Sequence, residues 1–172
     1  MKIIEAMKEA KLIEKKIRKN NELITEYSSA LDNEKLPFLT EEEQIKEVKK
    51  LVQSNIDLEE RYISLKVAID RTNLATKVSI EGAKREYTIF ELLVIKRKFG
   101  KTMIEKYTSM NSSKAEAKRM SYGRLSSEGK APSVIKFYDE REKNNSINDI
   151  ENFLAKIDSR LEVVNAVTDI IE

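Results

Sequence analysis

Apolar residues recur at alternating spacings of three and four along the first 31 positions of the chain. This is the heptad pattern of a coiled-coil seam, and it predicts a helix over residues 1–31. The seam positions are Ile3, Ala6, Ala10, Ile13, Ile17, Asn20, Ile24, Tyr27 and Leu31. Further apolar residues at Ile4, Met7, Leu12 and Leu23 widen the stripe, which indicates contact with more than one neighbour. Asn20 is either a device that fixes the register or a solvated residue near a helix bend.

A second heptad pattern begins after Thr40 and Glu43, which have the spacing of a capping box. It predicts a helix over residues 41–76. The seam positions are Val48, Leu51, Asn55, Leu58, Tyr62, Leu65, Ile69 and Thr72, and they are flanked by Ile45, Val52, Ile56 and Ile63. Two helices of similar length with a short connection containing Pro37 between them predict an antiparallel hairpin.

After residue 76 the spacing of the apolar residues changes several times along the chain. Val78 and Ile80 alternate with polar residues before Glu81-Gly82, which predicts a small β-hairpin or an ordered loop over 77–88. We expect helices over 89–110 and 114–122, a loop over 123–145 and a final helix over 146–171. The fold class predicted for residues 1–172 is therefore one all-α domain, an elongated antiparallel helical hairpin or bundle with coiled-coil seams.

The two ends of the chain carry more apolar surface than a two-helix contact covers, which predicts self-association into a homo-oligomer. The residues expected to form the self-association seam are Ile3, Ile13, Ile17, Ile24, Ile147, Ile150, Leu154, Ile157, Leu161 and Val164.

The composition removes most enzyme mechanisms. The chain has no Cys and no His, so it offers no thiol nucleophile, no imidazole base and no Cys/His zinc site. Its four glycines form no phosphate-binding loop, and no loop has the acidic pattern of a calcium hand. We therefore expect no catalytic residues, no metal and no cofactor.

Basic residues are concentrated in the middle of the chain, where residues 84–143 hold 15 basic and 8 acidic side chains. An acidic tail follows, and this asymmetry favours association between copies of the chain. Ordinary solvated helix faces explain the same charges. A third interpretation is nucleic-acid binding by segment 84–136, because Tyr87, Phe99, Tyr107 and Tyr122 are interleaved with the cations. The possible contacts for that function are Lys96, Arg97, Lys98, Lys101, Arg119 and Arg124.

Two short polar stretches resemble each other. In each, an Ile-Asp pair precedes Arg, and Asn precedes Thr by three residues. We interpret them as a junction network that ends helices and fixes register, with a ligand site as the alternative. The residues of this predicted polar junction network are Asp70, Arg71, Asn73, Thr76, Asp158, Arg160 and Asn165.

These stretches also carry a resemblance to a known family. Seven short stretches resemble the septicolysin-like family of small bacterial and phage helical proteins. They are Lys2 to Ala6, Ile69 to Thr76, Gly82, Thr88 to Glu91, Ile135-Lys136, Ile157 to Arg160, and Asn165 with Thr168 to Ile170. The chain departs from the family pattern between Met110 and Pro132, where it is longer, and it lacks an aromatic residue after Asn165. The resemblance implies an all-helical, oligomeric protein, and no catalytic residue is carried over from the family.

Neither a membrane span nor a signal peptide is expected, because no long apolar run occurs and charges appear from Lys2 onward. These observations predict a cytoplasmic protein, or one assembled into a virion. The function they favour is that of a non-enzymatic structural protein in a larger particle, with other structural proteins as possible partners. Nucleic-acid association is the alternative.

Overall fold

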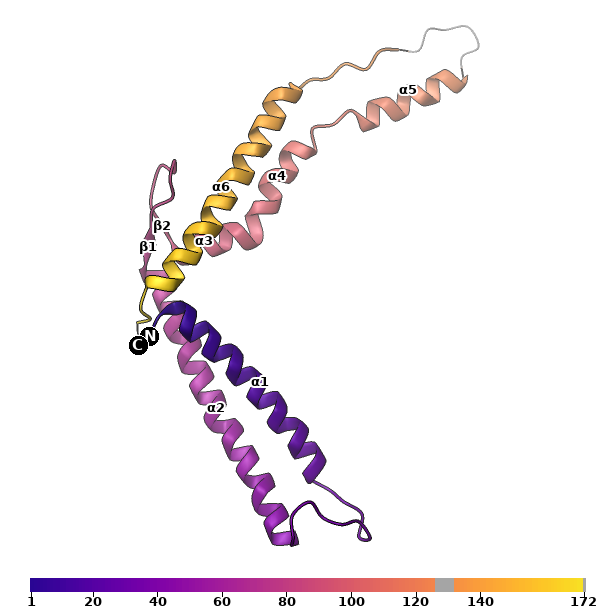
Figure 1. Ribbon diagram of the computed structural model, residues 1–172. Coiled ribbons are helices and arrows are strands. Elements are labelled where there is room, and N and C mark those ends of the chain that lie inside the picture. Colours follow the sequence, from indigo (N-terminus) through magenta and orange to yellow (C-terminus); the bar gives the residue numbers. More distant parts are fainter. Residues whose placement is uncertain (126–131, 172) are drawn as a thin grey trace. The chain divides into compact units, whose positions relative to one another are not determined.

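The structure is a computed structural model that describes residues 1–125 and 132–171, the side chains of residues 123–125 excepted. It is mostly helical, with antiparallel helix packing and one small two-stranded hairpin (Figure 1), which confirms the predicted fold class. In chain order the elements are α1 (Ile3–Tyr27), α2 (Glu41–Ala75), β1 (Lys77–Val78), β2 (Tyr87–Thr88), α3 (Ile89–Val94), the π-helical turn η1 (Ile95–Phe99), α4 (Gly100–Thr108), α5 (Ser113–Leu125) and α6 (Glu140–Val167).

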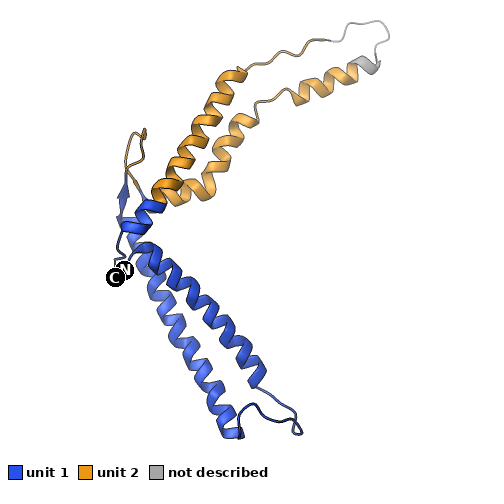
Figure 2. Cartoon of the chain, in the orientation of Figure 1, with its two compact units in different colours: residues 1–78, 88–90, 162–172 blue, residues 79–87, 91–161 orange. Residues whose placement is uncertain are grey.

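The chain divides into two compact units (Figure 2). Unit 1 comprises residues 1–78, 88–90 and 162–172, and unit 2 comprises residues 79–87 and 91–161. Unit 1 contains all of α1 and α2, unit 2 contains η1, α4 and α5, and the helices α3 and α6 are each divided between the two units.

Unit 1 is built on the predicted hairpin of α1 and α2. Its buried cluster contains Ala6, Ala10 and Ile13 of α1 with Leu65 and Ile69 of α2, all positions of the two heptad seams. Small Ala side chains let the helices approach closely, and the larger Leu and Ile fill the space opposite them. At the start of α2, the Thr40 hydroxyl accepts a hydrogen bond from the Glu43 N–H over 3.2 Å, as the capping box predicts.

The two chain ends meet in unit 1. The Ile3 N–H donates to the Thr168 carbonyl over 2.9 Å, and the Ile170 N–H donates to the Met1 carbonyl over 2.8 Å. Lys2 and Asp169 form an antiparallel β-bridge between these bonds. The C-terminal segment after α6 therefore pairs with the first residues of the chain.

Unit 2 contains a break that the sequence did not predict. The helix expected over 89–110 contains the π-helical turn η1, where the Gly100 N–H donates to the carbonyl of Ile95, five residues earlier. α4 then packs against α6, since a Cβ at Gly100 would lie 3.1 Å from both terminal methyl carbons of Leu154. Glycine at this position permits the close approach of the two helices.

Several element boundaries differ from the sequence prediction. α1 ends at Tyr27 instead of residue 31, leaving Leu31 exposed, and α5 covers 113–125 instead of 114–122. α6 begins at Glu140, so the predicted loop over 123–145 is too long at its C-terminal end and the last helix starts six residues earlier than expected. The reason is that Asp139 caps the helix, its carboxylate accepting from the Glu142 N–H over 2.8 Å. The same helix ends at Val167 instead of residue 171, because the chain turns there to pair with Lys2.

Candidate functional site

Many residues of the predicted self-association seam are covered within a single chain. Ile3 and Ile13 in α1, and Ile157, Leu161 and Val164 in α6, are all buried, with at most 6% of each side chain exposed. Ile17, Ile24, Ile147, Ile150 and Leu154 are half-buried. The reason is pairing within one chain: the α1 seam packs against α2 in the hairpin, and α6 packs against α4. Self-association therefore needs a different surface.

The predicted polar junction network is divided among different contacts. Asn73 is buried, Thr76 and Asn165 are half-buried, and Asp70, Arg71 and Arg160 are exposed. The Asp158 carboxylate lies in unit 2, where it forms an ion pair with Lys96 at 2.6 Å. The predicted residues are thus not assembled into one ligand site.

A different polar cluster joins the chain ends in unit 1. The Lys2 ammonium lies 2.6 Å from the Asp169 carboxylate and donates to the Val167 carbonyl, and the N-terminal ammonium lies 3.5 Å from Asp169. The buried Thr72 hydroxyl accepts from the Ile171 N–H over 2.8 Å and donates to Ala68. The hydrogen bond from Lys2 is the main reason that the pKa of Asp169 is lowered from its ordinary value. These bonds tie the C-terminal segment to the first residues of the chain and to α2 within unit 1.

The residues predicted to contact nucleic acid are dispersed, and two of them are paired with acids. Lys96 pairs with Asp158, and Lys101 lies 3.5 Å from Glu105. Arg97 and Lys98 are exposed on η1, and Arg119 is exposed on α5. The Arg124 side chain lies outside the described part of the structure. Of the interleaved aromatic rings, Tyr87 is covered by the Arg85 guanidinium at 4.2 Å and Tyr107 by the Lys106 ammonium at 4.9 Å.

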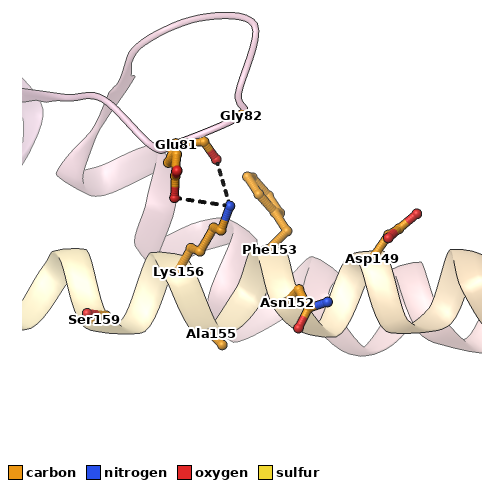
Figure 3. A pocket seen from close by; sticks show the side chains of 8 residues that line it. All are labelled: Glu81, Gly82, Asp149, Asn152, Phe153, Ala155, Lys156 and Ser159. Carbon is orange, nitrogen blue, oxygen red and sulfur yellow. Dashed lines mark hydrogen bonds and ion pairs between the residues drawn. The ribbon is translucent and has the colours of Figure 1, made fainter.

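A hollow of about 630 Å³ lies in unit 2, where the Glu81-Gly82 turn faces α6 (Figure 3). The Lys156 ammonium there lies 3.3 Å from the Glu81 carboxylate and 3.4 Å from its carbonyl oxygen. The Phe153 ring points toward the turn beside them. Glu81 is almost fully exposed, so this is a solvated surface ion pair, without the buried titratable group that a general acid or base requires.

The most regular exposed feature is a row of aliphatic side chains along α2. Its members share a position on one face of the helix and are 43–61% exposed: Ile45, Val52, Ile56, Ile63, Val67 and Leu74. We call these six residues the outer stripe. At about 100° per residue they fall within about 60° of one another around the helix axis, roughly 120° from the buried seam. α2 thus has two apolar faces, and α1 covers one of them.

The two faces of α2 have different repeats. The buried seam follows a heptad pattern, whereas the outer stripe is spaced by seven and four residues in turn, which is an 11-residue repeat. Scattered exposed apolar residues are normal on a protein surface, whereas a continuous row along a 35-residue helix is the pattern typical of an interaction surface. Sequence reasoning had placed Ile45, Val52, Ile56 and Ile63 beside the seam and had missed Val67 and Leu74. The signal that would have found them is the 11-residue spacing.

Comparison with known proteins adds nothing to this description: no protein-family model, curated protein sequence or solved structure matches the chain significantly. The resemblance to the septicolysin-like family thus stays a prediction. Within the described residues, no helix is long and apolar enough to cross a membrane, and no group of three or more acidic side chains is arranged to hold a metal ion.

Proposed function

We propose that the chain is a non-enzymatic structural protein that acts by self-association through the outer stripe of α2. The observation that carries this proposal is the stripe itself: six aliphatic side chains in one row, each about half exposed. Covering such side chains removes apolar area from water, which is the main favourable contribution to most protein association. The likeness to the septicolysin-like family, which implies an oligomeric helical protein, agrees with this role.

The proposed setting is a larger particle, such as a phage virion, built in the cytoplasm with other structural proteins. The two faces of α2 suit that role. The buried seam packs against α1, so the outer stripe can contact other subunits without disturbing the hairpin. The buried cluster of Ala6, Ala10, Ile13, Leu65 and Ile69 does not include any residue of the outer stripe.

The proposal is tested by placing charges in the stripe. In the variant Ile56→Glu/Ile63→Glu, association would bring carboxylates into an apolar contact, so we expect the mass measured by light scattering to fall to that of the monomer. The helical circular dichroism should be retained, because both side chains already face solvent. The matched control is Leu12→Glu in α1, which is 57% exposed and lies outside the stripe. Equal masses for the two variants would contradict the proposal.

Nucleic-acid association is the rival function, and one observation favours it. Arg97 and Lys98 are exposed side by side on a π-helical turn, and no acidic partner is found for them among the described residues. Binding that relies on several phosphate contacts weakens steeply between about 50 and 200 mM salt. Affinity for a mixed-sequence duplex that shows this loss, and that disappears in Arg97→Glu/Lys98→Glu, would favour the rival. Absence of binding at 50 mM salt would remove it.

A further inference from the structure

We infer that the outer stripe of α2 pairs with the same stripe of a second copy, antiparallel, about a two-fold axis that passes between Glu59 and Glu60. This inference rests on the proposed function and adds its partner, its orientation and its register.

The spacing of the stripe is the first argument. Read from either end, it follows the same order of steps: seven, four, seven, four and seven residues. In an antiparallel pair with its axis between Glu59 and Glu60, Ile56 therefore faces Ile63 of the second copy, Val52 faces Val67, and Ile45 faces Leu74. An isologous dimer needs such self-complementarity, since one patch must match itself after a two-fold rotation.

The charges within the stripe give the orientation. Lys49 and Asp70 are exposed, lie within about 30° of the centre of the stripe, and have no ion-pair partner among the described residues. The same two-fold axis puts Lys49 of each copy opposite Asp70 of the other copy, so the dimer contains this pair twice. A parallel pair in register would instead put Lys49 opposite Lys49 and Asp70 opposite Asp70. Opposite charges at matched positions favour the antiparallel arrangement.

The 11-residue repeat gives the shape of the contact. It corresponds to about 3.67 residues per turn, close to the 3.6 of an undistorted helix, so the row stays nearly parallel to the helix axis. Two helices can then touch along the whole distance from Ile45 to Leu74, about 43 Å, with slight right-handed coiling.

Repulsion between carboxylates at the centre of the contact opposes association. Glu59 and Glu60 of both copies gather near the two-fold axis on the two flanks of the stripe, and like charges at this distance weaken association. The variant Glu59→Gln/Glu60→Gln is therefore expected to tighten the dimer several-fold.

Cysteine cross-linking tests the orientation, because the chain has no cysteine of its own and each introduced thiol is unique. Ile56→Cys and Ile63→Cys are prepared separately, mixed under reducing conditions, and then oxidised. Antiparallel pairing predicts a disulfide between Cys at 56 and Cys at 63 of different copies. It predicts no dimer of either variant alone, since two Cys at position 56 would lie about 10 Å apart along the axis, beyond the reach of a disulfide. Lys49→Cys with Asp70→Cys forms a second such pair at the edge of the stripe, and Leu12→Cys is the control.

The outcomes separate this inference from the proposed function. Cross-links only in the mixtures 56 with 63 and 49 with 70 support the antiparallel pair. Disulfides within each single variant would show parallel pairing, and dimeric mass without any of these cross-links would show association elsewhere. Either result overturns the inference and leaves self-association in place. A monomeric mass without cross-links overturns both.

Discussion

The Asn20 side-chain amide donates to the Asn55 side-chain carbonyl oxygen over 2.9 Å and joins α1 to α2 inside a mainly apolar seam. Asn55 is 7% exposed, and its own amide donates to the Asn21 side-chain oxygen over 2.8 Å. Polar residues in a coiled-coil seam specify register at some expense of stability, because a one-step slip would leave their groups unpaired. The structure thus favours the register role of Asn20 over that of a solvated residue at a helix bend.

Asn55→Ala should lower the free energy of unfolding by about 1–3 kcal/mol, since it removes two hydrogen bonds at a buried position. Replacing both partners by Leu, in Asn20→Leu/Asn55→Leu, should recover most of that loss, because no polar group is then left unpaired. Urea unfolding followed by circular dichroism measures both. Ser64→Ala, an exposed position of α2, is the control. A double variant as unstable as Asn55→Ala would contradict this role.

The close approach of α4 and α6 predicts coupling between Gly100 and Leu154. Gly100→Ala gains up to about 1 kcal/mol of helix propensity. In the wild-type background the new methyl group meets the Leu154 methyl carbons at 3.1 Å, which offsets the gain. In a Leu154→Val background the crowding is relieved, so the same substitution should be more favourable by about 0.5 kcal/mol or more. Additive effects in the double-mutant cycle would show that Leu154 moves aside without a penalty.

The bond between Lys2 and Asp169 makes unit 1 sensitive to acid. The pKa of Asp169 is lowered in the folded chain, so its contribution to stability is present above the unfolded pKa of about 3.9 and is lost as pH falls through the folded pKa. Asp169→Asn should therefore reduce the urea midpoint at pH 7 and leave it almost unchanged near pH 2.5. Glu162→Gln, an exposed acidic position of the same unit, is the control. A loss of equal size at both pH values would mean that Asp169 acts without its charge.

Exchange of the charges at positions 49 and 70 tests the antiparallel register without altering an apolar side chain. Lys49→Asp would place like charges opposite each other twice per dimer, so we expect roughly tenfold weaker association. Asp70→Lys should do the same, and the double exchange Lys49→Asp/Asp70→Lys should restore wild-type affinity. Lys46→Asp, exposed on α2 but away from the stripe, is the control. Sedimentation velocity gives the affinities, and a double variant weaker than both single variants would contradict the register.

The sequence predicted the α1–α2 hairpin closely, because heptad seams and the Thr40 cap depend on residues that are close together in the sequence. It located the 77–88 hairpin for the same reason. It did not predict η1, since the π-helical turn accompanies the packing of α4 on α6 and residues 95–99 have no distinctive pattern. It also misplaced the start of α6, because Asn144, Asn145 and Ser146 resemble a helix start whereas the observed cap is Asp139.

The candidate site was only partly visible in the sequence. An excess of apolar residues beside the seams was evident, and it led to the expectation of self-association. How the helices of one chain pair decides which of those residues are buried. In the structure this pairing buries many of the seam residues that the sequence analysis had expected a second copy to cover. The 11-residue spacing of the outer stripe can be read from the sequence, but that this row is exposed while the heptad seam is buried was known only from the structure.

The mass of the wild-type protein in solution is the most direct test of self-association through the outer stripe. Sedimentation equilibrium over a range of concentrations should give twice the 19.9 kDa of one chain at micromolar concentration and above, with a decline toward 19.9 kDa on dilution. A mass of 19.9 kDa at every concentration, in both low and moderate salt, would contradict the account.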